Sequence, residues 1–154
     1  MSLVPLYEAL ALVSRQTTPL EMAPDNAQCA IKEAIRSPVE QPEILMLLEL
    51  LPYSWSLPLV PEVMDCAENA RYADRARALL GRIPFAKARE LVATEVARRL
   101  DAGPDDDWVF RRMAELLDYL GYYEELSDLV RRADASNDPD TRDVGDDYRS
   151  IDLR

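Results

Sequence analysis

The stretch RALLGRIP at residues 77–84 places a pair of leucines directly before a break made of glycine and proline. Two other stretches share this layout, LELLPYSW at residues 48–55 and AELLDYLG at residues 114–121. Successive leucine pairs lie 29 and then 37 residues apart, which is the range of helical-hairpin repeats. A single hairpin cannot bury its apolar face alone, so this repeated layout predicts hairpins that stack on their neighbours.

The rest of the chain supports an all-helical fold, because apolar residues recur with a helical period and no useful alternating pattern is present. Prolines and glycines punctuate the helices, since the residue before proline avoids the helical conformation and glycine is favoured just past a helix end. Gly81 and Gly121 are expected in that end position. The expected helices lie near residues 3–16, 25–36, 42–51, 62–70, 73–80, 85–100, 108–120, 123–133 and 139–149, with residues 52–61 as a proline-rich connection.

The predicted fold is therefore an all-α single domain over residues 1–150, with residues 151–154 as a frayed tail. In its hairpins the chain resembles HEAT-like repeat proteins, which implies a short α-solenoid of about four hairpins. Asp138-Pro139-Asp140-Thr141-Arg142-Asp143-Val144 is similar to the Asp-Pro turn that opens many HEAT repeats. In that turn the valine usually precedes the arginine, and here the order is reversed. An irregular helical bundle is the alternative.

Several classes of enzyme lack their signature in this sequence. The chain contains no histidine, which removes Ser-His-Asp and Cys-His catalysis and His-ligated zinc. There is no Walker loop, no dinucleotide-binding glycine pattern and no Cys-x-x-Cys. Among the 29 acidic residues no pair is marked out by its spacing. We therefore expect no catalytic residue, no cofactor and no metal site.

The cysteines and the hydropathy indicate a cytoplasmic protein. Cys29 and Cys66 lie inside apolar helical patterns and are expected to be buried thiols. The N-terminus lacks the basic region of a signal peptide, and no segment reaches the length of a membrane span.

The net charge of −11 argues against nucleic acid or an anionic membrane as the partner and favours a protein with a basic surface. The charge is uneven: residues 1–70 carry −7, residues 71–99 carry +5, and residues 100–154 carry −9. The basic stretch from Arg71 to Arg99 has two interpretations. It binds phosphate or an acidic peptide, or it pairs with acids of neighbouring hairpins, and the second is favoured because solenoid neighbours pack face to face.

Three consecutive aspartates at residues 105–107 could hold a metal, cap a helix or contact a partner. The spacing does not match an EF-hand loop, whereas a helix begins just before Trp108 and its free N–H groups favour an aspartate. One aspartate is expected to cap this helix, and two are left for a partner. Asn137 or Asp138 is expected to cap the last helix, whose acids face solvent or a basic partner.

Two groups of aromatic residues either tuck beneath a hairpin or serve as interface anchors, where Trp and Tyr are enriched. Tyr53 and Trp55 lie in the proline-bounded connection, and Tyr122 and Tyr123 follow Tyr119 at a later hairpin bend. Both interpretations stay open for these residues. Trp108, by contrast, is expected to be a core anchor.

In its small size, acidity, helical repeats and lack of catalytic residues, the chain resembles immunity proteins that neutralise bacterial polymorphic toxins. The resemblance implies a non-catalytic inhibitor that covers a basic toxin or effector. The alternatives are a general adaptor of a bacterial complex and a HEAT-like nucleic-acid-binding protein or enzyme that uses the Arg71–Arg99 stretch. The candidate partner-binding residues are Tyr53, Trp55, Asp105, Asp106, Asp107, Tyr122, Tyr123, Asp140, Asp143, Asp146 and Asp147.

Overall fold

The computed structural model describes residues 24–149, and all regular structure in this range is helical. The all-α prediction is therefore confirmed. The expected helix near residues 3–16 and the expected tail at 151–154 lie outside the described residues. The elements are α3 (Pro24–Ile35), α4 (Gln41–Leu50), α5 (Tyr53–Ser56), the 3₁₀ helix η1 (Leu57–Leu59), α6 (Val60–Glu68), α7 (Ala73–Gly81), α8 (Phe85–Ala102), α9 (Asp107–Leu120), α10 (Tyr123–Asp134) and α11 (Pro139–Tyr148).

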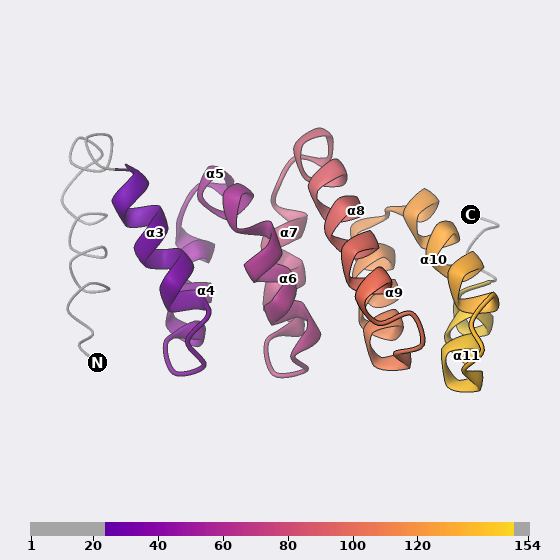
Figure 1. Ribbon diagram of the computed structural model, residues 1–154. Helices are drawn as coiled ribbons and strands as arrows, with labels where there is room; N and C mark the ends of the chain where they lie inside the picture. Colours follow the sequence, from indigo (N-terminus) through magenta and orange to yellow (C-terminus); the bar gives the residue numbers. More distant parts are fainter. Residues whose placement is uncertain (1–23, 150–154) are drawn as a thin grey trace.

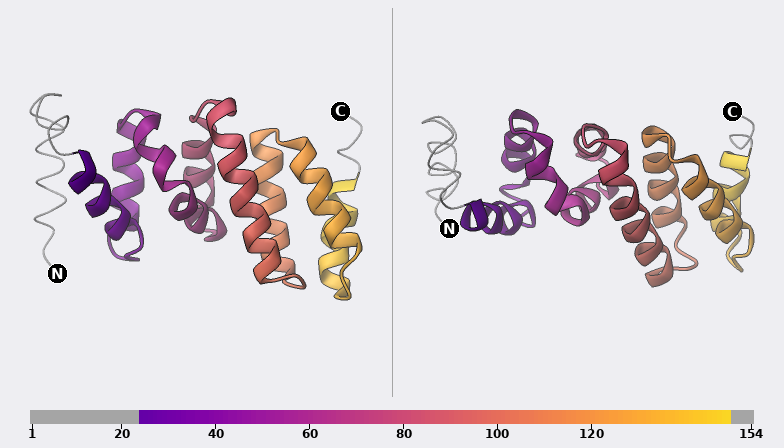
Figure 2. Two further views of the ribbon diagram at one scale, coloured as in Figure 1. Left: turned by 45° about the horizontal axis from the view of Figure 1, so that its top comes forward. Right: turned by 90° about the horizontal axis from the view of Figure 1, so that it is seen from above.

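The helices follow one another in pairs along an elongated molecule (Figure 1). α3 packs on α4, α6 on α7, α8 on α9 and α10 on α11. Contacts also run along one layer from α4 through α7 and α9 to α11, and along the other from α3 through α6 to α8. Two further views show the same single-file order (Figure 2). This arrangement is compatible with stacked hairpins, and the resemblance to HEAT repeats stays a prediction.

The bends between helices collect on two opposite edges of the molecule (Figure 1). We call the lower edge the one that carries the α3–α4, α6–α7, α8–α9 and α10–α11 bends. We call the upper edge the one that carries α5 and the α7–α8 and α9–α10 bends. Residues on the two edges are separated by the length of the helices between them.

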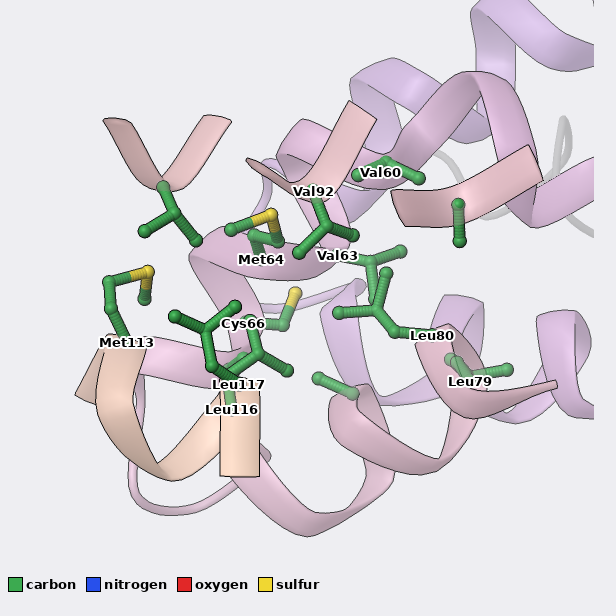
Figure 3. Close-up of a cluster of buried hydrophobic side chains, with 14 of the residues drawn as sticks. Val60, Val63, Met64, Cys66, Leu79, Leu80, Val92, Met113, Leu116 and Leu117 are labelled. Atoms are coloured by element: carbon green, nitrogen blue, oxygen red, sulfur yellow. The ribbon is translucent and has the colours of Figure 1, made fainter. Parts of the chain in front are cut away.

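One continuous hydrophobic core runs through the stack from Ile31 to Val144. At its centre, side chains of α6, α7, α8 and α9 point toward one another, with Val63 and Met64 above Leu116 and Leu117 (Figure 3). The leucine pairs of α7 and α9 are at most 1% exposed, as expected for the repeated leucine pairs of stacked hairpins. In α4, however, Leu50 is 78% exposed, and the buried pair is Leu47 and Leu48. The reason is helical phase: Leu47, Leu48 and Leu51 share the inner face of α4, and Leu50 lies opposite.

The connection expected at residues 52–61 is itself helical, which corrects the sequence prediction. Pro52 is the N-cap of α5, and the other two prolines occupy the first turns of η1 and α6. Proline is tolerated at these positions because the first turn of a helix does not need its N–H groups. Frequent proline here marks a series of helix starts instead of an irregular loop.

The two glycines expected to end helices behave differently. Gly121 has a φ of 70° and caps α9 in the left-handed conformation, as predicted. Gly81 is the last residue of α7, and Gly121 is the only glycine of the described residues with positive φ. Gly81 therefore does not serve as a left-handed cap, and Arg82 ends the helix in an ordinary helical conformation.

Four side chains differ in burial from what the sequence pattern suggests. The apolar spacing of α8 alone would put Phe85 and Leu91 on its inner face and Glu95 on its charged outer face. Glu95 is only 7% exposed, however, whereas Phe85 and Leu91 are 53% and 45% exposed. Glu95 is drawn inward by the arginine next to it in space, as described below. Trp108, expected in the core, is 48% exposed, and the Arg112 guanidinium covers its ring at 4.1 Å.

Candidate protein-binding surfaces

The basic stretch from Arg71 to Arg99 is paired within the molecule. Arg75 lies 2.8 Å from Glu49 on α4, and Arg77 pairs with Glu115 on α9. These pairs bridge neighbouring helix pairs, which is the internal arrangement that the sequence favoured.

Two further bases of the stretch bond to neutral oxygens of the preceding hairpin. Arg82 donates to the backbone carbonyls of Leu48 and Glu49 at 3.2 and 2.6 Å and of Leu51 at 2.9 Å. It therefore supplies partners to the C-terminal carbonyls of α4, where a cation also complements the helix dipole. Lys87 donates to the Tyr53 hydroxyl at 3.0 Å and lies over the Tyr53 ring.

Arg99 is the most deeply buried base, with 7% of its side chain exposed. It contacts Asp65 at 2.5 Å and Glu95 at 3.0 Å and also pairs with Glu68. Hydrogen bonds from Arg98, together with the charge of Arg99, hold the pKa of Glu95 below its ordinary value, against the opposing effect of burial. This cluster joins α6 to α8, and its charged groups form ion pairs with one another.

The cysteines differ from the prediction that both are buried. Cys66 is fully buried and Cys29 is exposed. Burial, with smaller contributions from nearby acids, raises the pKa of the Cys66 thiol to about 12, and Gln41 donates to its Sγ at 3.1 Å. Cys66 is therefore a neutral core thiol, shown beside the leucines of α7 and α9 in Figure 3.

The three aspartates of residues 105–107 each have a distinct place on the lower edge. Asp106 is the N-cap of α9 and accepts a hydrogen bond from the Val109 N–H at 3.2 Å, as predicted for one of the three. Asp107 is the first helical residue, where a negative charge complements the helix dipole. Asp105 accepts from the Ser136 hydroxyl at 2.5 Å, which ties the α8–α9 bend to the α10–α11 bend.

The acids at the start of α11 and along it differ in whether they have a partner within the chain. Asp138 caps the helix by accepting from the Thr141 N–H at 2.8 Å. Asp147 pairs with Arg111 at 2.9 Å and Asp146 with Arg149 at 2.8 Å. Asp140 and Asp143 are exposed and form no ion pair with a described residue. Only these last two are therefore open to a partner's charge.

The aromatic candidates also separate on burial. Tyr53 and Trp55 are partly buried and pack against the core, and Tyr122 is only 4% exposed. Tyr123 and Tyr119 are 48% and 56% exposed. The first three are thus mainly structural, and the last two present their rings to solvent.

The candidate residues do not form one surface. Asp105, Asp106, Asp107 and Asp140 lie at helix starts on the lower edge, whereas the aromatic residues lie at α5 and the α9–α10 bend on the upper edge (Figure 1). A small, flat patch on a partner therefore cannot contact both Trp55 and the acids of residues 105–107. The acidic candidates and the aromatic candidates therefore belong to two separate surfaces, one on each edge.

The upper edge carries two adjoining hollows between the α7–α8 and α9–α10 bends. The aromatic hollow, of about 470 Å³, is lined by Ala78, Gly81, Arg82, Ile83, Phe85, Tyr119, Leu120 and Tyr122. The acidic hollow, of about 190 Å³, is lined by Phe85, Arg89, Gly121, Tyr122, Tyr123, Glu124 and Glu125. Phe85 and Tyr122 line both, with their rings edge to face at 5.2 Å.

Phe85 is the residue of this site that the sequence did not single out. It counts as part of the apolar face of α8, but it is the first residue of that helix, directly after Pro84. Because Phe85 lies at the start of its helix, its burial depends on where the neighbouring bends are placed. The proline before it was the only available signal.

None of the described helices is long and apolar enough to span a membrane. Among residues 24–149, no group of three or more acidic or cysteine side chains is placed to hold a metal ion. Comparison of the chain with protein-family models, with curated proteins and with solved structures finds no match.

Proposed function

We propose that this protein is a non-catalytic inhibitor, of the immunity type, that binds and covers another protein with a basic surface. The observation that carries the proposal is an asymmetry in how charges are used. Every lysine and arginine in the described range contacts an acid, a carbonyl oxygen, a hydroxyl or an aromatic ring of the chain itself. Four of these bases, Arg71, Arg82, Lys87 and Arg142, contact only neutral groups and form no ion pair with a described residue. Several exposed acids in this range have no partner of any of these kinds.

Four of these acids lie in the second half of the molecule. Glu90, Asp118, Asp140 and Asp143 are exposed and form no ion pair with any residue of the described part of the chain. Unpaired charge of one sign attracts a partner of the opposite sign and speeds its capture. The free charge of the surface is therefore suited to a cationic protein and poorly suited to a polyanion.

The same asymmetry weighs against the alternative that the Arg71–Arg99 stretch grips nucleic acid. A base that contacts phosphate must first give up its present partner. For Arg99 this would leave Asp65 and Glu95 close together without their shared cation. Removing one member of a buried charge cluster typically costs about 3–5 kcal/mol. The free thiols Cys29 and Cys66 fit a role in the reducing cytoplasm.

The proposal is tested with the product of the adjacent gene, purified and mixed with this protein. We expect a complex whose affinity falls as salt is raised and which suppresses the toxicity of that product in cells. The double variant Asp140→Asn, Asp143→Asn should associate about tenfold more slowly at low salt. The matched control is the double variant Glu33→Gln, Glu43→Gln, which also removes two exposed acids, at the other end of the stack.

Two results would contradict the proposal. One is an affinity that does not change between low and high salt. The other is a double variant that associates as fast as the wild type and the control. An adaptor that works without electrostatic capture would show that second behaviour while still forming a complex.

A further inference from the structure

The two hollows of the upper edge can be reached together by one short segment of a partner. Because Phe85 and Tyr122 line both, the aromatic hollow and the acidic hollow share a wall. Tyr122 is almost fully buried and forms part of the floor, whereas Phe85 and Tyr119 are 53% and 56% exposed. Two large rings exposed side by side around a concave site are typical of interface anchors.

The aromatic hollow has the chemistry of an apolar subsite. Its one charged side chain, Arg82, is already directed at the backbone carbonyls at the end of α4. Tyr119 lies against the backbone of Gly81, since a Cβ built there would be 3.4 Å from its ring. The remaining lining is provided by aliphatic and aromatic side chains, which favour burial of an apolar group.

The acidic hollow has the chemistry of a cation subsite. Arg89 donates to Glu125 at 2.6 Å and also pairs with Glu124, so two carboxylates face a single base. Glu124 is still 83% exposed. The lining of the acidic hollow therefore has two carboxylates and one base, so its net charge is negative.

We propose that these hollows are the docking subsite for one short segment of the basic partner, an inference that rests on the proposed function. An apolar side chain of the segment enters the aromatic hollow, and a lysine or arginine of the same segment lies against Glu124 and Glu125. Side chains on one face of a segment are two residues apart when it is extended and three or four apart when it is helical. The segment thus carries its apolar and basic residues at one of these spacings.

The first experiment uses a defined peptide, acetyl-Gly-Leu-Ser-Arg-Gly-amide, titrated into the full isotope-labelled chain at low salt. We expect chemical-shift changes at Phe85, Tyr119 and Tyr122 and a dissociation constant on the order of 1 mM. Replacing the arginine of the peptide by glutamate, or its leucine by glycine, should weaken binding about tenfold. Equal affinity of the glutamate peptide, or shift changes confined to other parts of the molecule, would overturn the docking subsite.

The second experiment separates this inference from the proposed function. The double variant Phe85→Ser, Tyr119→Ser removes two exposed rings. The control, Leu50→Ser, Trp108→Ser, removes two exposed apolar side chains elsewhere on the molecule. We expect the first variant, and not the control, to lose about tenfold or more in affinity for the partner protein. Equal affinity of the first variant and the wild type overturns the docking subsite and leaves the proposed function standing. No affinity of the wild type for the partner, with the peptide still bound at the hollows, overturns the proposed function alone.

Discussion

At the scale of single residues, local rules of helix capping account for most of what is observed. Asp106 and Asp138 each accept a hydrogen bond from the N–H three residues later. Each is an aspartate directly before the first residue of a helix, the position at which aspartate is a favoured cap. Gly121 adopts the conformation that glycine tolerates best. These positions were predictable because the reason for each residue lies within four positions of it in the chain.

The two glycines at helix ends give opposite predictions when changed to alanine. Gly121→Ala should lower the free energy of unfolding by about 1 kcal/mol, because a side chain disfavours the left-handed conformation. Gly81→Ala should raise it by about 0.5 kcal/mol, because Gly81 is helical and alanine restricts the unfolded chain. Its Cβ would meet only Tyr119 at an ordinary contact distance of 3.4 Å. Urea denaturation of both variants measures the difference, and effects of the same sign would show that Gly81 is not an ordinary helical position.

At the scale of helices, side chains that bridge neighbouring pairs decide which charged residues are buried. Arg36, directly after α3, and Lys32 of α3 both reach the buried Glu62 of α6, at 2.7 and 3.3 Å. Arg99 of α8 reaches back to α6 in the same way. A helical period shows which residues share a face, but it does not show which neighbour that face will meet. For this reason the helical period alone misplaces Glu95, which it puts in solvent, and Phe85, which it puts in the core.

Adjacent arginines on α8 should differ sharply in their effect on stability. Arg99→Met leaves the carboxylates of Asp65 and Glu95 without their shared base and should lower the free energy of unfolding by about 3 kcal/mol. Arg98→Met removes a base that is 63% exposed and should cost less than about 1 kcal/mol. Chemical denaturation compares the two. A loss for Arg99→Met as small as that for Arg98→Met would show that the cluster contributes little.

The same cluster predicts a dependence of stability on acid pH. The folded pKa of Glu95 lies below its ordinary value of 4.5, so the unfolded chain binds a proton at this residue more readily than the folded chain. The stabilisation from Glu95 is therefore complete above pH 4.5 and is lost as the pH falls through the lower, folded pKa. Glu95→Gln should reduce the unfolding free energy at neutral pH and flatten its decline in acid. Parallel denaturation curves from pH 7 to about pH 3 test this, and an equally steep decline in the variant would contradict it.

At the scale of the whole molecule, the sequence predicted the all-helical class and most helix bounds but not the surface. Prolines, glycines and apolar period act locally, and they placed α3, α4 and α7 to α11 within a few residues. The separation of Asp105 from Trp55 onto opposite edges depends on the direction of each helix in the stack, which no local pattern encodes. The pairing of Phe85 with Tyr122 likewise depends on two bends that are far apart in the chain.

The bonds that Arg82 makes to the end of α4 also have a consequence for synthesis. Arg82 follows the carbonyl groups that it contacts by 31 to 34 residues, so α4 is synthesised before its C-terminal partner is added to the chain. Similar separations, of 31 and 36 residues, lie between Asp101 and Arg132 and between Arg111 and Asp147. The contacts that stabilise the end of such a hairpin can therefore form only after the next hairpin has been synthesised. Growth of the native structure should follow translation from the N-terminal side, one hairpin behind the ribosome.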